Sequence, residues 1–185
     1  QDGSYSSAHY NADEILPLAI ATRAKLDEIV HVPFEVGESL GFGSQKCSEL
    51  ECSLLGRRTV YNLNGTQSWS TPIAEKTYTI DVVLKPQDES AGVTLNIDGQ
   101  IRHTTPSGTK SWYPIRIRGV SANAVVELVA IGSGAYLDFL RIYPDEARME
   151  HFDYDAITQQ VTVMTDANMS SRFFEYDDAG RLFRV

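Results

Sequence analysis

The chain has 185 residues, of which 42% are hydrophobic and 10% aromatic, a composition typical of a folded protein with one sizeable core. Its formal net charge of −9 is spread along the sequence without a basic block, which argues against nucleic acid or an anionic lipid surface as a partner. No run of about 18 apolar residues offers a membrane-spanning helix. No export leader is recognisable, and the start at Gln1 and the abrupt end at Val185 lead us to expect a fragment of a longer protein.

Residues 1–30 are predicted to be a lead-in to the main domain. Residues 1–12 are small and polar. From Asp13 to Val30 the apolar side chains partly follow helical spacing, which favours a short helix with Pro17 in its first turn. An extended segment is the alternative, because the periodicity is incomplete.

From residue 31 to residue 144 the pattern is that of short β-strands separated by turn residues. The clearest strand is Lys76–Lys85, where apolar side chains alternate with Thr77, Thr79 and Asp81, as in a strand with one face buried and the other in water. The dipeptide Asp98-Gly99 predicts a two-residue hairpin, because both turn residues need positive φ. About eight such strands indicate an all-β sandwich, with jelly-roll topology as the commonest arrangement.

The last strand of this region lies in Gly132–Pro144 and contains one carboxylate, Asp138, between two largely apolar faces. A buried carboxylate needs an ion pair, hydrogen bonds or a metal. Pro144 ends the strand. Strict alternation assigns Tyr136, Asp138, Leu140 and Ile142 to one face, and Leu137, Phe139, Arg141 and Tyr143 to the other.

Residues 145–185 contain a repeated motif. Phe152-Asp-Tyr-Asp155 recurs as Phe174-Glu-Tyr-Asp177, at a period of 22 residues. Each copy is predicted to form a β-hairpin whose turn begins at the last residue of the motif, Asp155 or Asp177. Thr165-Asp-Ala-Asn168 marks a turn between the copies, and Gly180-Arg-Leu182 follows the second copy.

These motifs resemble the Rhs or YD-repeat family. The first copy departs from the family pattern, with Gln159-Gln160 in place of Gly-Arg and Met169 in place of the turn glycine. The resemblance implies a C-terminal β-hairpin appendage, residues 145–185. Its exposed strands would be open to a protein partner, since unpaired strand edges invite another chain.

Residues 31–144 resemble the jelly-roll, galactose-binding-like carbohydrate-binding modules that precede such repeats in some Bacteroidetes surface proteins. The segments that carry the resemblance are Val32-Pro-Phe-Glu35 with Gly37, Leu55-Gly-Arg-Arg-Thr59, Thr77-Tyr-Thr-Ile80 and Ala135–Pro144. The resemblance implies an extracytoplasmic, secreted or cell-surface module that binds a glycan. The alternative is a purely structural spacer or a protein-interaction domain of a cell-surface Rhs-type protein, without a glycan ligand. The sequence shows no GxSxG, HExxH or phosphate-loop motif, so we expect no catalysis.

A glycan site would use aromatic rings for stacking on sugar C–H faces, with polar groups beside them for the hydroxyls. The candidate residues are Trp69, Trp112, Tyr113, Arg102 and His103. Trp69 lies between two serines in a loop-like stretch and is the best candidate platform. Tyr113 alternates in phase with Ile115 and Ile117, which favours a place in the core.

The resemblance also implies a structural calcium ion that ties the first strand to the last through Glu35 and Asp138. Calcium takes six to eight oxygen ligands, so backbone carbonyls and waters would complete the shell. The alternative is that Asp138 pairs with an arginine or caps a turn while Glu35 is solvated. Cys47 and Cys52 either form a small disulfide loop or remain two free thiols, and without nearby histidines they make a poor zinc site.

Overall fold

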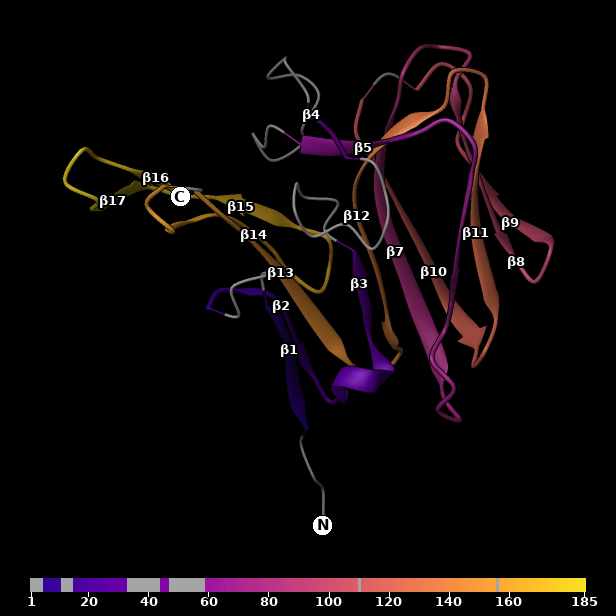
Figure 1. The fold of residues 1–185 in the computed structure, drawn as a ribbon, viewed down its shortest axis with the longest axis horizontal. Coiled ribbons are helices and arrows are strands. Elements are labelled where there is room, and N and C mark those ends of the chain that lie inside the picture. The colour runs from indigo at the N-terminus through magenta and orange to yellow at the C-terminus, as the bar shows by residue number, and fades with distance from the viewer. Residues whose placement is uncertain (1–4, 11–14, 33–43, 47–58, 110, 156) are drawn as a thin grey trace. The chain divides into compact units, whose positions relative to one another are not determined.

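The computed structural model in Figure 1 describes residues 5–10, 15–32, 44–46, 59–109, 111–155 and 157–185. The chain divides into two compact units, one formed by Asp27–Asp145 and the other by Gln1–Leu26 together with Glu146–Val185. Apart from one 3-10 turn, η1 (Leu26–Glu28), the described regular elements are β-strands, which confirms the predicted all-β class. Within these ranges, no helix is long and apolar enough to cross a membrane.

The unit Asp27–Asp145 is a β-sandwich of two antiparallel sheets. One sheet has the order β10-β7-β12-β5-β4, with β3 also paired to β12, and the other has the order β6-β11-β8-β9. Neighbouring strands are mostly not consecutive in the chain, so the chain crosses between the sheets as in a jelly roll. The strands of the first sheet are β3 (Val30–Val32), β4 (Ser44–Lys46), β5 (Thr59–Leu63), β7 (Thr77–Pro86), β10 (Tyr113–Ser121) and β12 (Ala135–Pro144). Those of the second are β6 (Thr66–Ser70), β8 (Gly92–Ile97), β9 (Gln100–Thr104) and β11 (Val125–Ile131).

The core lies between the two sheets and follows from the alternation of side chains along each strand. Val93, Leu95 and Ile97 of β8 point inward, as do Val126 and Leu128 of β11, and all five are buried. The predicted hairpin at Asp98-Gly99 is confirmed, since these residues have φ of 50° and 74° and join β8 to β9.

The strict alternation predicted for β12 is wrong because the strand contains a β-bulge. Leu137 pairs with Leu84 of β7, whereas Phe139 pairs with the preceding residue, Val83, so Asp138 is the extra residue. The bulge changes the phase of the strand at this point. Leu137, Leu140 and Ile142 all belong to the core between the sheets, and Asp138 itself is 1% exposed, as expected for a buried carboxylate.

Strand β7 also differs from its predicted half-buried pattern. Thr79 and Asp81, expected to face water, are 2% and 0% exposed, so both faces of the middle of this strand are buried. The predicted alternation of β7 is correct, but the burial of its polar face depends on the segments that cover this face, and the sequence of the strand does not show which segments these are.

The unit formed by the chain ends is a five-stranded sheet with the order β1-β2-β13-β14-β15, followed by a two-stranded hairpin of β16 and β17. Its strands are β1 (Ser6–Tyr10), β2 (Pro17–Thr22), β13 (Arg148–Tyr154), β14 (Val161–Thr165), β15 (Ser171–Phe173), β16 (Glu175–Tyr176) and β17 (Leu182–Arg184). The helix considered for Asp13–Val30 is wrong. Pro17 opens a strand instead, a position that proline tolerates, and β2 pairs with both β1 and β13.

Candidate functional site

Two of the residues predicted to bind a ligand lie against each other in the sandwich. The rings of His103 on β9 and Tyr113 on β10 are stacked, with centroids 5.6 Å apart and planes inclined by 24°. Both are half-buried, and Tyr113 packs against the core. His103 pairs with Leu95 and Tyr113 with Leu84, two core residues, so the rings lie on the inner side of their strands at the rim of the core.

The imidazole of His103 retains unused hydrogen-bonding capacity. Its Nε2 atom is buried and has no hydrogen-bond partner within the described part of the chain. A buried polar nitrogen without a partner is costly unless a ligand or water satisfies it. The pair therefore combines a half-buried ring surface with one buried polar atom.

Arg102 and Trp112 flank this pair in the sequence. Arg102 is exposed and is the extra residue of a β-bulge, because Leu95 pairs with His103 while Asn96 pairs with Ile101. Trp112 is half-buried and directly precedes β10. The two strands thus place four of the five predicted ligand residues in two short segments, joined by the contact between His103 and Tyr113.

Trp69, predicted to be the best platform, is instead a core residue. It is 9% exposed, pairs with Val126 of β11 and belongs to the core cluster. Sugar stacking needs an accessible ring face, so this placement counts against the role expected for Trp69. The serines on either side suggested a loop, but they alternate with the tryptophan on the outer face of β6.

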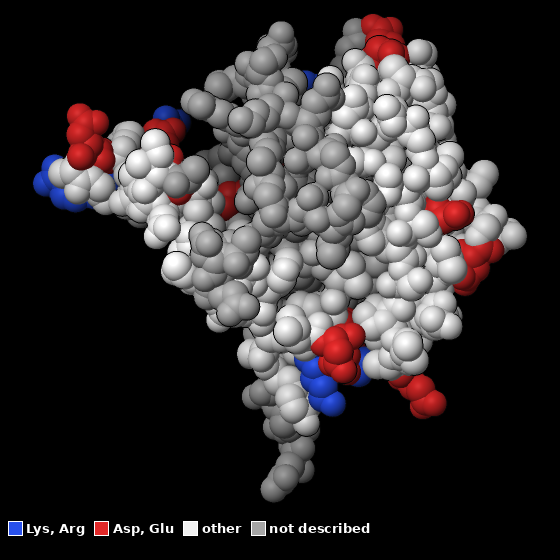
Figure 2. Space-filling view, viewed as in Figure 1, with Lys and Arg blue, Asp and Glu red and all other residues white. Residues whose placement is uncertain are grey.

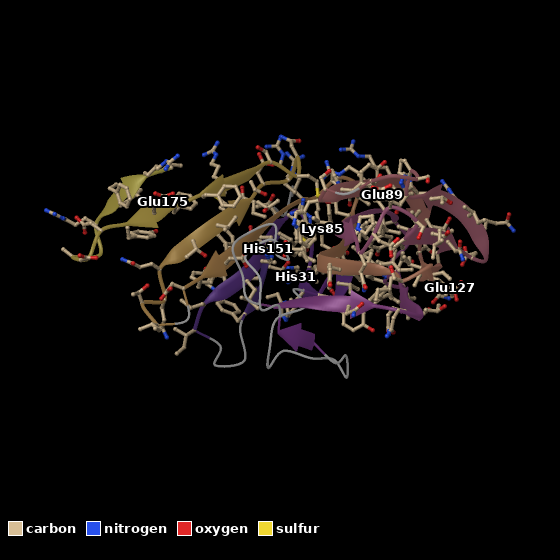
Figure 3. The ribbon with its side chains drawn as sticks, turned by 90° about the horizontal axis from the view of Figure 1, so that it is seen from above. His31, Lys85, Glu89, Glu127, His151 and Glu175 are labelled. Carbon is tan, nitrogen blue, oxygen red and sulfur yellow. The ribbon has the colours of Figure 1, made fainter. Side chains whose placement is uncertain are left out.

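Loops near the Trp112 segment are tied together by hydrogen bonds. Asp88 accepts hydrogen bonds from the backbone N–H of Ser90 at 2.8 Å and from the hydroxyls of Ser90 and Ser133. The serine hydroxyls and the backbone N–H favour the charged carboxylate and lower the pKa of Asp88 to about 2. Gly108 N–H donates to the carbonyl of Glu89 at 3.1 Å, which links the loop after β7 to the loop after β9. Figure 3 shows Lys85 near the end of β7 and Glu89 in the loop that follows.

The predicted metal ligands are only partly described. Asp138 lies buried in the bulge of β12, and Glu35 lies outside the described residues, as do Cys47 and Cys52. Within the described ranges, no group of three or more His, Cys, Asp or Glu side chains could hold a metal ion. The expected pairing of Glu35 with Asp138 therefore stays a prediction.

Sequence reasoning missed a buried charge cluster on the sheet face away from the core. Asp81 of β7 lies directly between Arg116 of β10 and Arg141 of β12. Arg116 donates through Nε and Nη2 to the two carboxylate oxygens at 2.6 and 2.8 Å, and Arg141 Nε donates to Oδ2 at 2.8 Å.

The same carboxylate also binds a phenol. Tyr143 donates its hydroxyl to Asp81 Oδ2 at 2.8 Å, and burial together with the negative charge of Asp81 raises the pKa of Tyr143 to about 12. Opposite charges across neighbouring strands are a recognisable signal only once the strand register is known. The cluster has the geometry of a structural ion pair, since Asp81 and Arg141 are fully buried.

The charged side chains on one face of the molecule are scattered. On the face drawn in Figure 2, carboxylates stand in several separate groups, and the few Lys and Arg side chains do not gather into a basic patch. A binding site for nucleic acid would need such a patch. This observation agrees with the net charge of −9.

No protein-family model and no curated protein matches the chain. Among solved structures, it is similar to the CBM36-1 domain of a multidomain xylanase from the hindgut metagenome of Trinervitermes trinervoides, with 19% identity over 62% of this chain and 95% of that chain and a TM-score of 0.39. It is also similar to a carbohydrate-binding module, CBM36, in complex with calcium and xylotriose, with 18% identity, 61% and 98% coverage and a TM-score of 0.38.

A third similar structure is the carbohydrate-binding module CBM6cm-2 of Cellvibrio mixtus lichenase 5A in complex with cellotriose. It shares 14% identity over 63% of this chain and 98% of that chain, with a TM-score of 0.40. Likeness at such low identities and TM-scores carries no argument about function. The fold assignment rests on the strand order and register described above.

Proposed function

We propose that the sandwich, residues 31–144, is a non-catalytic carbohydrate-binding module of an extracytoplasmic protein. The observation that carries this proposal is the stacked pair of His103 and Tyr113 at the rim of the core, with Trp112 directly before the tyrosine in the chain and the exposed Arg102 directly before the histidine. Ring surfaces bind the C–H faces of sugars, while the imidazole and guanidinium nitrogens bind hydroxyl groups. We assign no catalytic role to any residue of this module.

The first prediction is that soluble or gel-bound polysaccharide retards the full chain and that Trp112→Ala weakens this binding at least about tenfold, as removal of a central aromatic contact does in many sites. Arg102→Ala should weaken polysaccharide binding less than Trp112→Ala does, because the side chain of Arg102 is exposed and water competes for its hydrogen bonds. The measurement is affinity electrophoresis against xylan and mixed-linkage β-glucan. Xylotriose and cellotriose, bound by two of the similar modules, serve as soluble competitors.

Ile101→Ala is the matched control for this experiment. Ile101 is 69% exposed on the same strand as His103, but it pairs with Asn96, whose side chain lies on the outer face. Its removal should leave retention unchanged. If the unmodified chain is not retarded by any of a broad polysaccharide panel, the glycan proposal is wrong and the structural alternative is favoured.

We also propose a structural calcium ion held by Asp138 and Glu35. Asp138 suits this role because its carboxylate offers hard oxygen ligands and is 1% exposed, where a negative charge needs compensation. The second prediction is that calcium raises the melting midpoint, since an ion at 100 times its Kd adds about 2.7 kcal/mol to the free energy of unfolding.

The calcium measurement compares melting curves in excess calcium and in excess chelator. Asp138→Asn should abolish the difference between the two melting curves. Excess magnesium should raise the melting midpoint of the unmodified chain less than excess calcium does. An unchanged midpoint in the unmodified chain would rule out the ion.

A second candidate function is a spacer or protein-interaction domain, favoured by exposed apolar side chains in the C-terminal strands and at the residue that follows them. Phe173, Leu182, Phe183 and Val185 are 45%, 50%, 65% and 69% exposed. Edge strands with apolar side chains can pair with a strand of another chain. The protein-interaction candidate places binding on the C-terminal strands, whereas the glycan module places it on the sandwich. The Trp112→Ala experiment therefore separates the two candidates, because Trp112 belongs to the sandwich.

A further inference from the structure

The unit formed by the chain ends contains three hairpins with a β-bulge at the same place, although the turn of the third is one residue shorter. In the hairpin β13–β14, Tyr154 pairs with Val161, and a β-bulge lies between Asp153 and Tyr154. In the hairpin β16–β17, Tyr176 pairs with Leu182, and the bulge lies between Glu175 and Tyr176. These two hairpins contain the repeated Tyr-Asp motif.

The third hairpin is β1–β2, which precedes the sandwich in the chain. Tyr10 pairs with Pro17, and the bulge lies between His9 and Tyr10. The rest of the register agrees as well: Ala8 pairs with Ile20 as Phe152 pairs with Met164. A bulge before the last tyrosine of the first strand is therefore common to all three hairpins.

The sequences of the first two hairpins also align without a gap. Pro17 follows Tyr10 at the same spacing as Val161 follows Tyr154, and Tyr10-Asn-Ala12 stands where the later copy has Tyr154-Asp-Ala156. In the later copy, Asp155 Oδ1 accepts the N–H groups of Ile157 and Thr158 at 2.9 and 2.7 Å. Asparagine carries an equivalent side-chain oxygen and forms the same kind of turn.

The tyrosines show how one hairpin packs on the previous one. Tyr154 donates its hydroxyl to the carbonyl of Pro17 at 2.8 Å, and Tyr176 donates to the carbonyl of Val161 at 2.9 Å. Pro17 and Val161 are the equivalent first residues of β2 and β14. The hairpin β1–β2 thus supplies to the second copy the same acceptor that the second copy supplies to the third.

The pairing between hairpins repeats in the same way. Ala19, Ile20 and Ala21 of β2 pair with His151, Glu150 and Met149 of β13. Val163, Met164 and Thr165 of β14 pair with Phe173, Arg172 and Ser171 of β15, which are the equivalent positions one repeat later. The copies therefore agree in three separate respects. These are the strand pairing within a hairpin, the strand pairing between neighbouring hairpins and the hydrogen bond donated by the tyrosine.

We propose that Ser6–Thr22 is the first copy of the Tyr-Asp repeat and that the sandwich is an insertion between the first and second copies. Between the second and third copies the chain makes a tight turn, in which Asp166 N–H donates to the carbonyl of Ser170 at 3.0 Å. The equivalent residues of the first copy are Thr22 and Arg148, and these pair with each other. The chain leaves the repeat sheet at Thr22 and returns to it at Arg148, so the whole sandwich takes the place of one turn.

Residues 6–22 of the predicted lead-in therefore have a different role. They are the beginning of the repeat sheet, and the sandwich is attached to that sheet at both ends. This assignment does not depend on whether the sandwich binds a glycan. It predicts that the turn of the first hairpin can be exchanged for the turn of the second.

The test is a turn exchange in the full chain, the third prediction. Residues 11–16 are replaced by the equal-length segment Asp155–Gln160, and amide hydrogen exchange is followed by NMR in β1, β2 and β13. We expect protection in these strands to stay within about threefold of the unmodified chain, because the transplanted turn closes the same register.

The control carries the same segment with its first aspartate, the equivalent of Asp155, replaced by alanine, which removes the side-chain oxygen that accepts two backbone N–H groups of the turn. Its protection in β1 and β2 should fall at least about tenfold. Equal loss of protection in the exchange and in the control would overturn the proposal. A second pair of variants, Tyr154→Phe and Tyr176→Phe, should increase exchange to a similar extent on the strands that accept their hydroxyls, β2 and β14. An effect confined to Tyr176→Phe would also contradict the equivalence.

Discussion

Replacing Gly134 by alanine should lower the free energy of unfolding of the sandwich by about 3 kcal/mol or more, the largest loss we expect from a single methyl group. Gly134 has φ of +88°, and a Cβ atom placed there would overlap the carbonyl oxygen of Leu63, a backbone atom that cannot turn away. The backbone N–H of Gly134 also donates to Ile131 at 3.0 Å, and its carbonyl accepts from Gln87 at 3.1 Å. Moving the loop to relieve the overlap would break these bonds and displace the start of β12.

Gly108→Ala is the matched control. Gly108 also has a left-handed backbone, with φ of +80°, but an added Cβ would meet nothing within 4 Å. Gly108→Ala should therefore lower the free energy of unfolding only by the intrinsic penalty of a left-handed backbone, about 1–2 kcal/mol. Urea unfolding monitored by tryptophan fluorescence measures both variants. Equal losses would show that the close approach to Leu63 does not determine the need for glycine at position 134.

Arg141→Met should lower the free energy of unfolding by about 3–5 kcal/mol, because it leaves the carboxylate of Asp81 buried with one ionic partner fewer. Both side chains are 0% exposed in this ion pair, so water cannot replace the guanidinium. Arg116→Met should cost less, since the side chain of Arg116 is 22% exposed and its place is open to water. The two variants remove the same charge from the same carboxylate and differ in burial.

The double variant Asp81→Asn with Arg141→Met tests the cause of this loss. It removes both buried charges, so it should be more stable than the sum of the two single losses predicts, with a coupling of about 1–3 kcal/mol. Additive losses would mean that Arg141 acts through packing of its stem rather than through its charge. Urea midpoints of the four proteins complete the cycle.

The general pattern of the sandwich could be predicted from local sequence because it depends on short-range features. Alternation identified Lys76–Lys85 as a strand, which the structure has as β7, and Asp98-Gly99 identified a hairpin through its backbone preference. Part of the candidate site could also be predicted from the sequence. His103 and Tyr113 were selected as residue types, but their contact depends on the register of β9 and β10, which no local pattern contains.

Errors arose where long-range pairing decides the structure. Pro17 opens a strand because β13 lies beside it, although the intervening chain includes the entire sandwich. The bulge at Asp138 cannot be predicted from the sequence, because both faces of β12 are apolar. A change in which side chains face the core therefore leaves the hydrophobic pattern of the strand unaltered. Asp81 was assigned to water because the sequence cannot show that Arg116 and Arg141 lie on the neighbouring strands.

By itself, the sequence determined the all-β class, the hairpin at Asp98-Gly99 and the two evident Tyr-Asp motifs, because alternation and turn chemistry act over a few residues. Only the tertiary structure decided that Trp69 lies in the core, that Asp81 is buried between two arginines, and that Tyr10 occupies the position of Tyr154 and Tyr176. Each of these depends on which strands become neighbours. In a sheet, segments far apart in sequence share one register, and that register, rather than composition, sets the environment of each side chain.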